Sequence, residues 1–112
     1  MTTAEFIVCE VLKCGTYDIE TMFGEMDDDL FHNAMEACKD YGELTANGIW
    51  YEAMCIAISQ VFGDEYVEDF EIDANAMASS VYVLDGANKK IKGFKAKAAE
   101  FEELTGFSIG GW

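Results

Sequence analysis

His32 is the one histidine of the chain, and its surroundings could support proton transfer. If residues 28–41 form a helix, Asp28 and Glu36 flank the imidazole at i−4 and i+4, close enough to shuttle a proton. Cys38 could act as a nucleophile, but at i+6 it lies on a different helix face from His32. Because neither an oxyanion motif nor a third orienting group accompanies this pair, we expect no catalytic residues and a non-enzymatic protein.

The four cysteines, Cys9, Cys14, Cys38 and Cys55, follow no metal-binding pattern. Zinc sites use closely spaced pairs of cysteine or histidine, and only Cys9 and Cys14 are spaced in this way. The acidic runs 27–29 and 64–69 lack the glycine of an EF-hand loop and place apolar residues at ligand positions. We therefore expect buried free thiols, no metal and no cofactor. Loose binding of divalent cations by the clustered carboxylates stays open.

Charge is the unusual property of this chain. The chain contains 22 acidic residues, seven lysines and no arginine, which gives a net charge of −15. This exceeds the magnitude of about 2–8 typical of a small domain. Residues 1–88 hold 19 acids and two lysines, a net charge of −17, whereas residues 89–112 hold five lysines and three acids. The C-terminal segment is thus basic, whereas the rest of the chain is strongly acidic. We expect the lysines of this segment to contact the acidic part of the protein.

This acidity disfavours direct nucleic-acid binding, so we expect none, although the five lysines of the last helix could touch RNA locally. It suggests imitation of nucleic acid instead. A domain of this length has a diameter of about 34 Å, and that length of duplex DNA carries about 20 charges. The 19 acids before Lys89 match this number. We expect partner binding through acids in two clusters and through two aromatic residues among them: Asp64, Glu65, Tyr66, Glu68, Asp69, Phe70, Glu71 and Asp73, then Asp27, Asp28 and Asp29.

The sequence therefore predicts an inhibitor that occupies the basic groove of a nucleic-acid-binding protein or complex. In size, charge and lack of catalytic motifs it is similar to the small acidic phage proteins that block restriction or CRISPR effectors. The alternative is an assembly module, in which the basic C-terminal helix of one subunit docks on the acidic face of another subunit, as in a homodimer, or of a partner protein.

The first half of the chain predicts a β-hairpin followed by two helices. Residues 6–12 are β-branched and apolar, and residues 17–23 alternate between apolar and acidic side chains across a glycine turn. Asp27 or Asp28 can cap a helix that runs to about Tyr41. Residues 49–62 carry one charge and are apolar all round, which predicts a central helix buried on more than one face.

The second half predicts less regular structure before a last helix. Residues 64–84 fit either short helices or strands. Apolar residues at three- and four-residue steps predict an amphipathic helix over 87–105 that ends at Gly106, and the tail could add an edge strand. We expect a single α+β domain over 1–112, with a small antiparallel sheet (the N-terminal hairpin plus one or two further strands) packed against three helices. Without a signal peptide or membrane span, a cytoplasmic protein is expected.

Overall fold

The computed structural model describes residues 21–41, 45–74, 79–84 and 86–112. It is an α+β fold, as predicted, with Cα extents of 42 × 26 × 21 Å. The predicted hairpin lies outside the described residues except at 21–23, which are helical and not part of a strand. Met22 and Phe23 are adjacent and both buried, at 1% and 4% exposure, and Phe23 packs edge-on against Phe31. A strand would send these neighbours to opposite faces, whereas a helical turn brings both to the core.

Helix α3 (Asp28–Tyr41) begins at the predicted cap. The Asp27 carboxylate accepts a hydrogen bond from the backbone N–H of Leu30 at 3.1 Å. This satisfies one of the free donors that every helix N-terminus leaves. The buried side of α3 is formed by Leu30, Phe31, Ala34, Met35 and Cys38.

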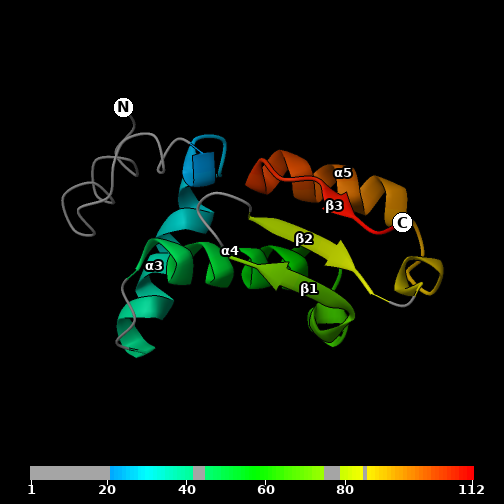
Figure 1. Cartoon of the computed structure of the whole chain (residues 1–112), viewed down its shortest axis with the longest axis horizontal. Coiled ribbons are helices and arrows are strands. Elements are labelled where there is room, and N and C mark those ends of the chain that lie inside the picture. Colours follow the sequence, from blue (N-terminus) through cyan, green and yellow to red (C-terminus); the bar gives the residue numbers. More distant parts are fainter. Residues whose placement is uncertain (1–20, 42–44, 75–78, 85) are drawn as a thin grey trace.

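Helix α4 (Ala46–Val61) is the central element, and it packs against α3, α5 and β1 (Figure 1). It starts three residues before the predicted position because the Thr45 hydroxyl caps it by accepting the Gly48 N–H at 3.0 Å. Asn47 and Gly48, a pair typical of turns, therefore lie in the first turn of this helix. Seven side chains of α4 are buried: Ile49, Trp50, Ala53, Met54, Ala57, Ile58 and Val61.

The segment that fitted both helix and strand contains both. A 3-10 helix, η1 (Asp64–Asp69), leads directly into strand β1 (Phe70–Asp73). Strand β2 (Ser80–Val83) pairs antiparallel with β1, with Phe70 opposite Val83. Strand β3 (Ile109–Gly110), the predicted edge strand, pairs in parallel with β2. The sheet is therefore mixed, with strand order β1-β2-β3, and not wholly antiparallel as predicted.

The parallel pairing follows from the connection between β2 and β3. The chain leaves β2 through a 3-10 turn, η2 (Ala87–Lys89), and returns along helix α5 (Phe94–Thr105) before it enters β3. Such a crossover lets the second strand run in the same direction as the first. The predicted helix 87–105 is thus interrupted, because Gly93 adopts a left-handed conformation (φ +71°) immediately before α5. The predicted end at Gly106 is confirmed.

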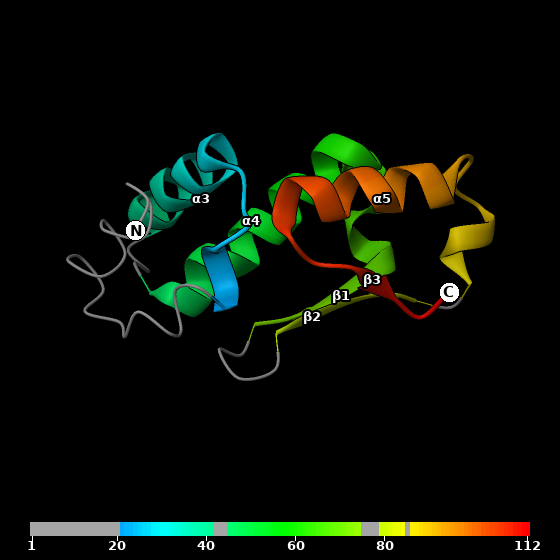
Figure 2. The same cartoon turned by 90° about the horizontal axis from the view of Figure 1, so that it is seen from above.

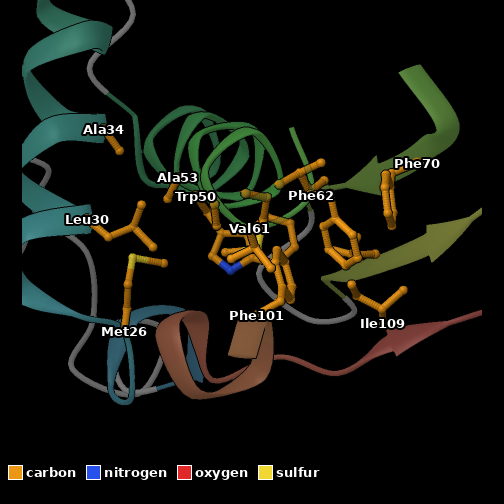
Figure 3. Packing of buried hydrophobic residues seen from close by; sticks show 14 of the residues in the cluster. Met26, Leu30, Ala34, Trp50, Ala53, Val61, Phe62, Phe70, Phe101 and Ile109 are labelled. Carbon is orange, nitrogen blue, oxygen red and sulfur yellow. The ribbon is translucent and has the colours of Figure 1, made fainter. Parts of the chain in front are cut away.

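Helices α4 and α5 lie on the same side of the sheet (Figure 2). An aromatic cluster packs in this core. The ring centroid of Phe62 lies 4.9, 5.3 and 6.5 Å from those of Phe70, Phe94 and Phe101, respectively. Figure 3 shows Phe62, Phe70 and Phe101 in the cluster. Over the ranges described here, no helix combines the length and the apolar character needed to cross a bilayer.

Candidate partner-binding surface

Four of the predicted site acids lie on η1. Asp64, Glu65 and Glu68 are exposed and Asp69 is half-buried. The opposite side of η1 carries Tyr66 and Val67, which are half-buried and pack against the core. Because these two side chains anchor the turn, the acids on either side of them in the sequence, Asp64 and Glu65 before and Glu68 after, project to the surface.

Strand β1 continues this acidic surface through its alternation. Glu71 and Asp73 are exposed, whereas Phe70 is 6% exposed and packs against Phe62 and Phe94. Phe70 was predicted as a partner contact, but it belongs to the core and is unavailable at the surface. Tyr66, the other predicted aromatic, keeps part of its surface exposed.

The face of the sheet that points away from α4 and α5 is acidic and carries one exposed aromatic ring. We call this the outer sheet face; its members are Glu71, Asp73, Ser80, Tyr82 and Gly110. Glu71 lies opposite Tyr82 and Asp73 opposite Ser80 in the antiparallel register. Tyr82 is 42% exposed. Sequence reasoning did not select Tyr82 as a site residue, although the alternation in Ser80-Val81-Tyr82-Val83 was the signal that places it opposite the buried valines.

The second predicted cluster is a separate patch. Asp28 and Asp29 are exposed in the first turn of α3, where the helix dipole favours negative charge. The backbone N–H of Asp27 donates to the carbonyl of Leu104 at 2.9 Å, which joins this patch to the C-terminal end of α5. In both cartoon views α3 and η1 are separated along α4 (Figures 1 and 2), so the acids at 27–29 and at 64–73 do not form one continuous surface.

The lysines near the C-terminus lie on η2, on the connection between η2 and α5, and on the first turn of α5. Lys89, Lys90, Lys92 and Lys95 are exposed. Within the described ranges none of the lysines at 89–97 forms an ion pair with an acid; the ion pair seen there joins Lys39 to Glu36 at 3.1 Å. The expectation that the C-terminal lysines meet the acidic body is therefore not met among these residues, and both kinds of charge stay open to solvent.

The surroundings of His32 differ from the arrangement considered for proton transfer. His32 is half-buried and packs edge-on against Phe31, with ring centroids 6.0 Å apart. Among the residues placed by the structure, its imidazole makes no hydrogen bond to Asp28 or Glu36. In that same part of the chain, no group of three or more His, Cys, Asp or Glu side chains is arranged to hold a metal ion.

Cys55 lies in an open groove of about 410 Å³ that is lined by α4 and Val67 of η1. The pKa of its thiol is raised to about 11: burial raises the pKa most, the negative charge of Glu52 also raises it, and a hydrogen bond with Tyr51 lowers it in part. A thiol with this pKa is protonated at neutral pH and is a weak nucleophile.

Comparison with known proteins found no matching family model, no similar curated protein and no similar solved structure.

Proposed function

We propose that this chain is a non-enzymatic interaction protein that occupies a basic nucleic-acid-binding surface of a partner protein or complex. The surface that would do so consists of η1 and β1, with the patch at 27–29 as a second contact. In this proposal the chain acts as an inhibitor of the nucleic-acid-mimic type, like the small phage proteins that block restriction or CRISPR effectors.

The observation that carries the proposal is the density of exposed carboxylates along residues 64–73. A 3-10 helix rises about 2.0 Å per residue and a strand about 3.4 Å, so this segment runs over about 20–25 Å. Six acids share that length: Asp64, Glu65, Glu68, Glu71 and Asp73 are exposed, and Asp69 is half-buried. Over the five intervals between them the mean spacing along the chain is about 4–5 Å, compared with the rise of about 3.4 Å per phosphate along one strand of DNA.

Unneutralised charge supports the same conclusion. Between Lys39 and Lys89 the sequence contains no lysine, and it contains no arginine anywhere. Repulsion among like charges opposes folding, so a surface of this kind is costly unless a cationic partner compensates it. Complementary fields would steer the association and make it sensitive to salt.

The test is affinity capture from a lysate of the organism that carries the chain, at low and at high salt, followed by elution with double-stranded DNA. We expect a nucleic-acid-binding protein that DNA displaces. The variant Glu65→Gln/Glu68→Gln/Asp69→Asn should weaken capture about tenfold or more, because three charge pairs worth roughly 0.5 kcal/mol each approach the 1.4 kcal/mol that corresponds to a factor of ten.

A matched control removes the same amount of charge from other exposed positions, with Asp40→Asn, Glu100→Gln and Glu103→Gln. This control should capture the partner almost as well as the parent chain. Equal weakening by both variants would mean that net charge, and not the surface of η1 and β1, governs binding. Undiminished capture by the first variant would refute the proposal.

One observation favours the alternative, an assembly module. The lysines at 89–97 form a separate basic region that is not paired with the acids of the described ranges. A head-to-tail contact between two copies would place the lysines of one copy against the acids of the other and so neutralise both regions. Light scattering on the purified chain distinguishes the two functions: salt-sensitive self-association without a nucleic-acid-binding partner supports assembly.

A further inference from the structure

We propose that the outer sheet face receives an arginine side chain of the partner, with the guanidinium stacked on the ring of Tyr82 and paired with the carboxylates of Glu71 and Asp73. This inference rests on the proposed function, because it assumes a basic protein partner. It goes further by naming the cationic group that the surface recognises and the residues that recognise it.

The side chain of Tyr82 is held by contacts along its own strand and with β3, and it remains exposed. Its hydroxyl accepts a hydrogen bond from the Ser80 hydroxyl at 3.0 Å, two residues back on the same strand. On the neighbouring strand, a Cβ at Gly110 would lie 3.3 Å from Cδ1 and 3.8 Å from Cε1 of Tyr82. The edge of the ring that carries Cδ1 and Cε1 therefore lies next to the position where residue 110 has no side chain. The residue keeps 42% of its surface exposed and so remains accessible to a partner.

Carboxylates stand beside this ring at distances set by the strand register. Glu71 is directly opposite Tyr82, so their Cβ atoms are about 4.5–5.5 Å apart. Asp73 is the diagonal neighbour, at about 7–8 Å. A cation is attracted to an aromatic face when it lies within about 6 Å of the ring centroid. A cation on Tyr82 is thus within reach of both acids.

Arginine fits this arrangement better than lysine. A guanidinium is planar, stacks on aromatic rings and donates two parallel hydrogen bonds to a carboxylate, whereas an ammonium is a compact and strongly hydrated point charge. The chain itself contains no arginine, so neither this molecule nor a second copy of it can supply the group. Within the described ranges no lysine is ion-paired with Glu71 or Asp73. The arginine must come from a different protein.

The test compares the binding of an oligoarginine peptide and an oligolysine peptide of equal length, at fixed ionic strength, by isothermal titration calorimetry. The parent chain should prefer oligoarginine by about threefold or more. Tyr82→Thr, which keeps a residue suited to an exposed strand, should weaken oligoarginine binding by about threefold to thirtyfold and abolish the preference. Tyr82→Phe retains the ring and should retain the preference.

Tyr51 provides the matched control for loss of an exposed ring. It is 47% exposed but lies on α4, away from the outer sheet face. Tyr51→Thr should leave both peptide affinities unchanged. The variant Glu71→Gln should weaken oligoarginine binding more than oligolysine binding, which gives a second readout independent of the ring.

Equal binding of the two peptides by the parent chain, or an unchanged preference in Tyr82→Thr, overturns the inference. Either failure is distinct from failure of the proposed function. If Tyr82→Thr captures the DNA-displaceable partner as well as the parent chain does while the Glu65/Glu68/Asp69 variant does not, the acidic surface stands and the arginine site is wrong. If the Glu65/Glu68/Asp69 variant also captures it undiminished, the proposed function fails.

Discussion

Replacing Gly106 by alanine tests the junction where α5 meets the segment before α3. Gly106 ends α5 in a left-handed conformation, with φ at +83°. A Cβ at this position would lie 2.8 Å from Cβ of Glu25 and 3.5 and 3.6 Å from two of its backbone atoms. The Asp27–Leu104 backbone hydrogen bond of 2.9 Å holds the two segments together, so the added methyl group has little room to move away.

The expected loss of stability has two parts. A non-glycine residue in the left-handed region costs about 1–2 kcal/mol, and the lower entropy of the unfolded chain offsets about 0.4–1 kcal/mol of this. Overpacking against Glu25 adds about 1–3 kcal/mol. Together these contributions should lower the free energy of unfolding of Gly106→Ala by about 1–5 kcal/mol, with a central value of about 3 kcal/mol. At roughly 4 °C per kcal/mol for a chain of this size, the central value lowers Tm by about 12 °C.

Gly93 offers a control with the same backbone conformation and no contact. Its φ is +71°, and a Cβ there would meet no atom within 4 Å. Gly93→Ala should lower the free energy of unfolding by about 1 kcal/mol or less. Thermal and urea unfolding followed by circular dichroism measure both variants, and Glu25→Gly should recover part of the loss in Gly106→Ala. Equal stability of the two alanine variants would refute the close contact at Gly106.

Two further predictions concern buried polar groups. The Thr105 hydroxyl donates to the carbonyl of Phe101 at 2.8 Å and accepts the N–H of Phe107 at 3.1 Å. Thr105→Val leaves that N–H unpaired and should lower the free energy of unfolding, measured in urea, by about 1–3 kcal/mol. Thr105→Ser keeps the hydroxyl and should cost less, so equal losses in the two variants would contradict this role. The rate of Cys55 alkylation, followed by peptide mass spectrometry, should rise with pH and reach half of its maximum near the thiol pKa of about 11. Glu52→Gln removes a negative charge and should lower that midpoint. A midpoint near the ordinary cysteine pKa of about 8.5 would contradict the burial of this thiol.

Features that depend on neighbours in the sequence were predicted correctly. Asp27 caps α3 because its carboxylate needs only the N–H groups of the next turn, and Gly106 ends α5 because only glycine readily adopts that backbone conformation. The central position of α4 was also predicted, since a helix that is apolar on all sides must be covered on several of them.

Features that depend on distant contacts were missed or left undecided. Residues 64–73 divide into η1 and β1 because Phe70 pairs with Val83 on β2 and enters the aromatic core. The residue pattern within 64–73 does not reveal either of these contacts. Residues 21–23 are helical because burial of both Met22 and Phe23 outweighs the alternating pattern. The parallel direction of β3 follows from the path of α5 across the same side of the sheet.

The composition of the candidate surface can be read from the sequence alone: the excess of carboxylates, the absence of arginine and the concentration of six acids in ten residues. Which of these groups lie together depends on how the chain folds. Strand register set Glu71 and Asp73 beside Tyr82, packing removed Phe70 from the surface, and α4 separated the acids at 27–29 from those at 64–73. Charge is a property of each residue alone, whereas a binding face is created by backbone pairing and core packing between residues that are far apart in the chain.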